Sequence, residues 1–99
     1  MQKLVEDFIN KYNLRTNEQI RYIDLVSEVG ELGKEILNDT NYGKNNYSHT
    51  SQTTDELGDC LFSLLALCCE MNVDATSALQ QVLAKYEARF AEKGSIGSQ

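Results

Sequence analysis

Apolar residues recur at three- and four-residue steps along four segments of the chain, and no segment shows the two-residue alternation of a β-strand. The sequence contains no proline that would interrupt a long helix. The expected helices cover about residues 2–13, 16–38, 53–72 and 74–94. We therefore predict an all-α, four-helix bundle-like single domain over residues 1–94, followed by a flexible tail at residues 95–99.

Capping signals and polar segments set the expected helix boundaries. Residues 16–19 (TNEQ) and 53–56 (TTDE) both have the form of a capping box. The connection at residues 39–52 is rich in Asn, Ser, Thr and Tyr, and at about fourteen residues it exceeds the usual helix-to-helix connection. It is interpreted equally well as a ligand-contacting lid and as a tolerated insertion.

The apolar residues predict how the helices pack. The third segment is apolar at nearly every position from Leu57 to Met71, which is typical of a central helix. The last segment has one face that we expect to point inward: Ala78, Leu79, Val82, Leu83, Tyr86 and Phe90. A chain of 99 residues has a limited core, so association with further copies would bury more of this surface.

The charge balance limits the partners of the chain. Its formal net charge is −6 and it has no basic block, so we expect no direct binding to nucleic acid. An acidic chain can still bind a polyphosphate where divalent cations reverse the local charge. The N-terminal residues lack the pattern of a signal peptide, and the longest apolar run, residues 60–69, is too short to span a bilayer. We expect a cytoplasmic protein without membrane contact.

Two acidic pairs with the same spacing lie on two different expected helices. The first is Glu28 and Glu31, and the second is Glu56 and Asp59. Carboxylates three residues apart project from one face of a helix. Two such pairs facing each other would repel strongly unless a cation lay between them. The pattern therefore favours a multi-metal site of the kind that handles phosphate esters.

A solvated acidic face is the alternative interpretation of the first pair, because these acids lie opposite the apolar side of their helix in a ladder: Asp24, Glu28, Glu31 and Glu35. The second pair favours a metal. Asp59 begins an apolar stretch, where an ionised carboxylate is costly without a partner. No Lys or Arg occurs between Lys44 and Lys85 to provide one.

Three basic residues at four-residue steps, Lys85, Arg89 and Lys93, share one face of the last expected helix. They could neutralise a phosphate chain. The alternative is that they complement the dipole at the helix C-terminus, which suits Arg89 and Lys93 better than Lys85.

The motif Glu28-Val-Gly-Glu31, followed by Glu56-Leu-Gly-Asp59-Cys-Leu-Phe, resembles the ExxE…ExxD signature of the MazG-like all-α nucleotide pyrophosphohydrolases. The resemblance covers about residues 20–93. It implies that the four acids bind Mg²⁺, as two or more ions with Mn²⁺ as an alternative, and are the catalytic residues. The implied reaction converts a nucleoside triphosphate to the monophosphate and pyrophosphate. The resemblance further implies that Lys85 and Arg89 contact phosphates and that the chain forms a homodimer or homotetramer.

Other functions remain open at this point. A non-enzymatic helical oligomerisation or adaptor module would have acidic faces that are merely solvated or engaged by a basic partner, and a nucleotide-binding sensor would bind without hydrolysis. A di-iron carboxylate bundle is disfavoured because such sites use Glu-x-x-His motifs and the single histidine, His49, lies in the expected loop. The sequence does not identify the base, although Tyr42 and Tyr47 in that loop are candidates to contact it.

Overall fold

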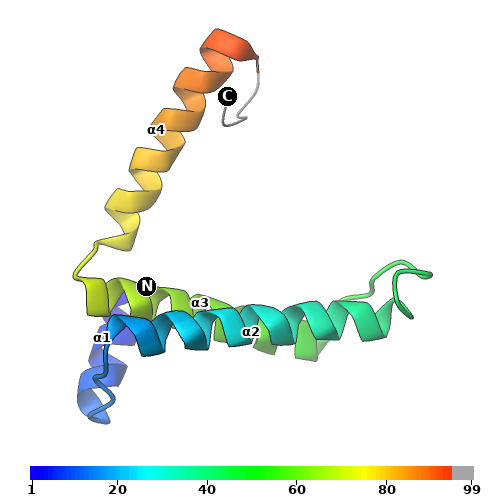
Figure 1. Cartoon of the computed structure of the whole chain (residues 1–99), viewed down its shortest axis with the longest axis horizontal. Helices are drawn as coiled ribbons and strands as arrows, with labels where there is room; N and C mark the ends of the chain where they lie inside the picture. The colour runs from blue at the N-terminus through cyan, green and yellow to red at the C-terminus, as the bar shows by residue number, and fades with distance from the viewer. Residues whose placement is uncertain (95–99) are drawn as a thin grey trace.

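The computed structural model describes residues 1–94, which form four helices (Figure 1). The helices are α1 (Gln2–Lys11), α2 (Glu18–Asp39), α3 (Ser51–Met71) and α4 (Ala75–Lys93). The described part of the chain contains no strand, so the predicted all-α fold is confirmed. The predicted tail at residues 95–99 lies outside the described residues.

The start of α3 differs from the prediction. The helix begins at Ser51, because Thr50 is its N-cap and accepts a hydrogen bond from the backbone of the first turn. The Thr53 side chain in turn accepts a hydrogen bond from the Thr50 N–H, at 3.0 Å, and completes a capping box. The predicted capping box at residues 53–56 is therefore wrong: Thr53 closes the box that Thr50 opens.

The other helix ends are closer to the expected positions. Asn17 rather than Thr16 caps α2, so the predicted box at residues 16–19 is also wrong. Helix α4 starts near the predicted residue 74: Asp74 is its N-cap, and the Asp74 side chain accepts a hydrogen bond from the Ser77 N–H at 2.9 Å. Gly94 ends α4 in the left-handed conformation, with φ at 71°, which glycine adopts without steric cost.

A small core lies between α1 and α3. Helices α2 and α3 run side by side as an antiparallel pair, and α1 crosses α3 near the end of the pair that is far from the connecting loop (Figure 1). The core consists of Val5 and Ile9 from α1 with Leu65 and Ala66 from α3. Phe62 and Ala75 pack against it. The apolar stripe of α1 is therefore only partly covered.

A buried ion pair ties the segment between α1 and α2 to the end of α3. The side chains of Arg21 and Glu70 are 9% and 8% exposed, and Arg21 Nε lies 3.6 Å from Glu70 Oε1. Arg21 Nη2 donates a hydrogen bond of 2.6 Å to the Leu14 carbonyl oxygen. Arg15 lies 3.5 Å from the same Glu70 oxygen, and the Thr16 N–H donates to it at 3.4 Å. The Glu70 carboxylate thus pairs with both arginines and accepts the hydrogen bond from the Thr16 N–H.

Helix α4 projects away from the other three (Figure 1). The chain bends by 101° between α3 and α4. No residue of α4 is buried, and Leu79, Leu83 and Phe90 are each more than half exposed. The predicted inward face of α4 is therefore wrong for a single chain, because none of the other helices within residues 1–94 covers it.

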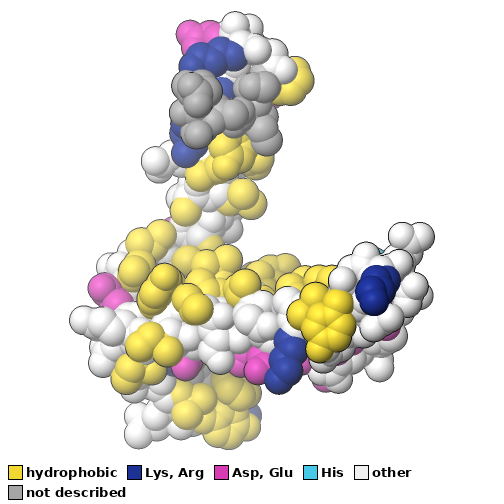
Figure 2. All heavy atoms as spheres, turned by 45° about the vertical axis from the view of Figure 1, so that its right-hand side comes forward, with side chains coloured by type: hydrophobic (Ala, Val, Ile, Leu, Met, Phe, Trp, Pro, Cys, Tyr) yellow, Lys and Arg dark blue, Asp and Glu magenta, His cyan; other side chains and the backbone are white. Residues whose placement is uncertain are grey.

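Helices α2 and α3 also leave much apolar surface uncovered, and Figure 2 shows hydrophobic side chains in patches along this pair and on α4. The exposed apolar residues include Ile23, Val26, Leu57, Leu61 and Leu64. Helix α3 is thus central in position but covered on only part of its surface. No single helix within residues 1–94 is long and apolar enough to cross a membrane, and α3 and α4 would reach that length and composition only as a bent pair.

Candidate metal centre

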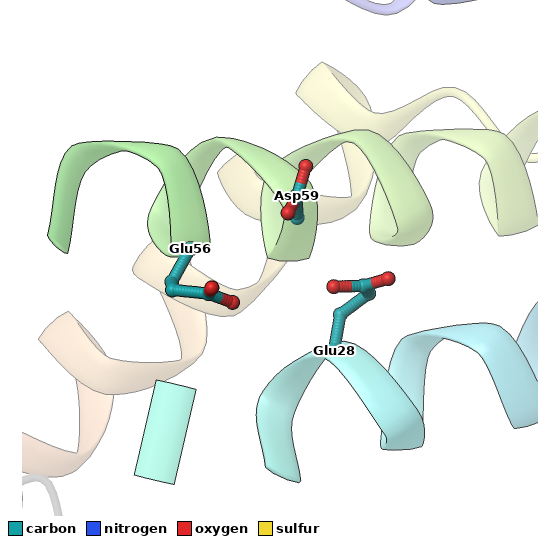
Figure 3. Close-up of side chains that lie close together, drawn as sticks. All are labelled: Glu28, Glu56 and Asp59. Carbon is teal, nitrogen blue, oxygen red and sulfur yellow. The ribbon is translucent and has the colours of Figure 1, made fainter. Parts of the chain in front are cut away.

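Three carboxylates from two helices meet in one place. Glu28 from α2 and Glu56 and Asp59 from α3 each offer an oxygen, and the three oxygens lie within 4.8 Å of one another. In Figure 3 the Glu28 side chain rises from α2 toward α3, and the Glu56 carboxylate lies between the two helices. The three-residue spacing puts Glu56 and Asp59 one turn apart, and the antiparallel packing brings Glu28 opposite them. We call these three residues the carboxylate group.

Glu31, the fourth predicted ligand, is not brought into the carboxylate group. Its side chain is exposed on α2, one turn after Glu28. It is nevertheless close enough for its negative charge to contribute to the raised pKa of Glu28. The structure therefore gathers three of the four predicted ligands and leaves the fourth beside them.

The burial of the carboxylate group differs from the expectation. Glu28 and Glu56 are half-buried, whereas Asp59 is exposed. The argument that placed Asp59 in an apolar interior is wrong, because the core that α1 forms with α3 lies further along α3, at Phe62, Leu65 and Ala66. The group lies on an open face of the helix pair.

Within the described part of the chain, no basic side chain forms an ion pair with the carboxylate group. The ion pairs formed among residues 1–94 lie elsewhere, at the α1–α2 connection and along α1. Glu56 accepts one neutral hydrogen bond, from Gln52 Nε2 at 2.7 Å. Desolvation, and then the negative charges of Asp59 and Glu56, raise the pKa of Glu28 above its ordinary value. A cluster of oxygen ligands with uncompensated charge fits a divalent cation such as Mg²⁺.

The raised pKa of Glu28 predicts a pH dependence of stability. The folded state binds a proton at Glu28 more tightly than the unfolded state, so the free energy of unfolding should fall as pH rises above the ordinary carboxyl pKa of 4.5. Added Mg²⁺ should reverse this loss at neutral pH, because it binds the ionised group. Thermal melts between pH 4 and 8, in chelator and in Mg²⁺, would measure both effects.

Glu28→Gln should reduce both the pH dependence and the Mg²⁺ effect. Asp55→Asn is the matched control, because Asp55 is exposed on α3 outside the carboxylate group and should leave both unchanged. Identical responses of the two variants would show that the carboxylate group does not act as a unit.

The two basic residues predicted to contact phosphates lie away from the carboxylate group within a single chain. Lys85 and Arg89 both lie over the Tyr86 ring on α4, at 5.6 and 6.0 Å from its centroid. Helix α4 projects away from the helix pair that holds the carboxylates (Figure 1). Their role in phosphate binding therefore stays a prediction.

The residues of the α2–α3 loop are engaged locally. The Tyr47 hydroxyl shares a hydrogen bond with Thr53 Oγ1, and the Tyr47 ring lies against His49 at 5.4 Å between centroids. Tyr42 is 71% exposed, and the loop lies at the end of the helix pair remote from α1 (Figure 1). The base contact predicted for these tyrosines stays a prediction.

Sequence reasoning missed an open apolar pocket beside the carboxylate group. Its volume is about 470 Å³, and its lining combines Asp59 with residues of α1 and α3: Leu4, Val5, Phe8 and Phe62. The available signal was the aromatic residue that closely follows Asp59 on α3. No local pattern in the sequence indicated that α1 would cross α3 at that point.

A known protein family matches most of the chain. The family model described as the MazG nucleotide pyrophosphohydrolase domain matches residues 15–92. The match includes all the predicted site residues, from Glu28 to Arg89, and leaves α1 outside. No curated protein and no solved structure matches the chain.

Proposed function

The chain belongs to the MazG nucleotide pyrophosphohydrolase family, and we propose that it hydrolyses a nucleoside triphosphate to the monophosphate and pyrophosphate, with Mg²⁺ as cofactor, in nucleotide-pool housekeeping in the cytoplasm. The observation that carries this proposal is the carboxylate group. Three acidic side chains converge within 4.8 Å without an ion-pair partner among residues 1–94, on the two helices that bear the ExxE and ExxD pairs. A purely solvated acidic face does not require such convergence.

The carboxylate group suits Mg²⁺ because magnesium prefers carboxylate and phosphate oxygens. Glu28, Glu56 and Asp59 would bind two or more Mg²⁺ ions per site. Mn²⁺ is an alternative to Mg²⁺. Bound magnesium supplies positive charge that offsets the negative charge developing on the phosphate oxygens. The exposure of Asp59 leaves this face of the site open to a polyphosphate.

A residue of the chain would also accept the proton that the attacking water loses. A water oxygen bonds to the α-phosphorus, and the bond from that phosphorus to the oxygen bridging to the β-phosphate breaks. Pyrophosphate leaves with the bonding electrons, while the water loses a proton. A carboxylate not engaged in ion binding can accept that proton. We favour Glu31 for this role, because it lies beside the carboxylate group but outside it.

The position of α4 bears on the phosphate contacts. Leu79, Leu83 and Phe90 stay exposed on a helix that packs against the core of its own chain at its first residue, Ala75. A homodimer or homotetramer would cover this surface. We propose that α4 of one copy packs against the helix pair of another and so delivers Lys85 and Arg89 to its phosphates.

Mixing two inactive variants tests this delivery between copies. Glu56→Gln removes a carboxylate, and the double variant Lys85→Ala, Arg89→Ala removes the basic side chains. If α4 acts on the partner copy, mixed dimers formed by refolding the two variants together should recover part of the activity, because one of their two sites is intact. Pyrophosphate release by each variant alone is the baseline. A mixture no more active than the separate variants would contradict delivery between copies.

The assay that tests the proposed function uses a panel of nucleoside triphosphates with Mg²⁺ and with chelator. We expect monophosphate and pyrophosphate in equal amounts, and only with the divalent cation. Stabilisation by nucleotide and Mg²⁺ without product would favour a sensor. The absence of both product and stabilisation would favour the adaptor module.

A further inference from the structure

The side chain of Gln2, the first residue of α1, is hydrogen-bonded to the hinge between α3 and α4, which we define as residues 72–74. Gln2 Nε2 donates a hydrogen bond of 2.8 Å to the Val73 carbonyl oxygen. Gln2 Oε1 accepts a hydrogen bond of 2.7 Å from the Ala75 N–H. The two bonds lie on either side of Asp74, the N-cap of α4. We call this pair of bonds the Gln2 clamp.

The bond to Ala75 goes beyond what is needed to start α4. The N–H of the first residue of a helix has no acceptor within the helix, and water can satisfy it. The N-cap side chain of Asp74 accepts from Ser77 instead. Helix α4 would therefore begin at Ala75 without Gln2. The clamp adds a fixed relation between α1 and the start of α4.

Few other contacts fix the direction of α4. No residue of α4 is buried, and its first residue, Ala75, is the one that packs against the core. At the hinge, Asn72 has the left-handed conformation, with φ at 55°, and the Val73 N–H donates to the Cys68 carbonyl oxygen at 2.9 Å. These local features end α3. Among the hydrogen bonds of residues 1–94, the clamp connects the hinge to another helix.

A helix held only at its first turn turns a small change of angle into a large displacement. Lys85 follows Ala75 by ten residues, which is about 15 Å of helix, so a rotation of about 10° at the hinge moves its backbone by roughly 2–3 Å. Arg89 lies one turn further along and moves more. A displacement of this size separates a basic side chain from a phosphate oxygen at hydrogen-bond distance.

We propose that Gln2 is a positioning residue: it sets the direction of α4 and thereby places Lys85 and Arg89 for the polyphosphate. This rests on the proposed function and on the proposed delivery of these basic residues to another copy. Gln2 belongs to α1, which lies before the family match at residues 15–92. Both of its side-chain hydrogen bonds end at the hinge, so its effect passes through the orientation of α4.

The variant Gln2→Met tests the role of the clamp, because methionine has a similar length but no amide to form the two bonds. In Mg²⁺, the dissociation constant of inorganic tripolyphosphate, measured by calorimetric titration, should rise about tenfold, as expected for the loss of about one charge-assisted contact. Lys3→Met is the matched control, because Lys3 is exposed on the same turn of α1 and bonds to Asp7. It should bind tripolyphosphate as the wild-type chain does.

A second pair of titrations tests whether Gln2 acts through the basic residues. In the Lys85→Ala, Arg89→Ala background, Gln2→Met should weaken tripolyphosphate binding no further. The shift in melting temperature that Mg²⁺ alone produces should equal the wild-type shift in Gln2→Met, because the carboxylate group is unchanged. The same fold-change in both backgrounds would overturn the positioning role, as would an unchanged dissociation constant in Gln2→Met.

Amide hydrogen exchange followed by NMR tests the clamp independently of phosphate binding. The Ala75 amide should exchange slowly in the wild-type chain and faster in Gln2→Met, while the core amides of Leu65 and Ala66 keep their rates. Equal Ala75 rates in the two chains would show that the clamp does not hold the hinge. Faster exchange of the core amides as well would make Gln2 a general structural residue.

The failure of the proposed function has a different signature. A wild-type chain that binds no tripolyphosphate in Mg²⁺ would contradict the proposed function and the positioning role with it. If Gln2→Met still speeds exchange of the Ala75 amide in that case, the clamp is a contact that holds α4 without a role in phosphate binding.

Discussion

Replacing Asp59 with asparagine should lower the rate of pyrophosphate release by about a hundred- to a thousandfold, as expected when one group that stabilises transition-state charge is removed. Asp59 completes the carboxylate group with Glu28 and Glu56. Its side chain is exposed and takes part in no ion pair among residues 1–94, so the substitution removes no structural contact of that kind. Far-ultraviolet circular dichroism should therefore match the wild-type chain.

The same substitution should change stability in opposite directions with and without the cation. In chelator, Asp59→Asn removes one like charge from the group and should leave the melting temperature equal or higher. In Mg²⁺, the wild-type chain gains stability by binding the ion, and the variant should lose most of that gain. Thermal melts at neutral pH measure both effects, and general damage to the fold would lower both melting temperatures instead.

Asp55→Asn is the control for this prediction, because it removes the same charge from α3 at an exposed position outside the carboxylate group. It should keep wild-type turnover and the wild-type response to Mg²⁺. Near wild-type turnover by Asp59→Asn would show that the site assignment is wrong.

The helices could be predicted from the sequence because their apolar spacing and caps are local. The predicted end of α4 at Gly94 agrees with the structure, and the start of α3 is displaced only because Thr50 competes with Thr53 as its N-cap. Which surface becomes buried is not local information. The pattern of Leu79, Leu83 and Phe90 shows that α4 has an apolar face, but it does not show whether the same chain covers it.

The candidate site also depends partly on local sequence information and partly on long-range packing. The spacing of Glu56 and Asp59 on one helix is local, and it places both in the carboxylate group. Glu31 stays outside because the register between two antiparallel helices depends on long-range packing, which sequence spacing does not fix. The open pocket formed with Phe8 depends on where α1 crosses α3, which is also long-range information.

Replacing Arg21 with methionine should destabilise the chain by about 3–5 kcal/mol, as expected when one member of a buried ion pair is removed. Glu70 would keep a buried negative charge, with Arg15 at 3.5 Å as its remaining ion-pair partner. The Leu14 carbonyl oxygen would lose its 2.6 Å hydrogen bond from Arg21. For a domain of this size, the melting temperature should fall by roughly 4–8 °C for each kcal/mol.

The double variant Arg21→Met, Glu70→Leu tests whether the loss of stability comes from the buried Glu70 charge that has lost its Arg21 partner. Replacing both partners by apolar residues removes the uncompensated carboxylate and should recover much of the stability. Lys3→Met is the matched control: it breaks the exposed Lys3–Asp7 pair of 2.7 Å and should leave the melting temperature nearly unchanged. If the double variant were no more stable than Arg21→Met, the contribution of Arg21 would lie in its packing and its bond to Leu14 rather than in charge pairing with Glu70.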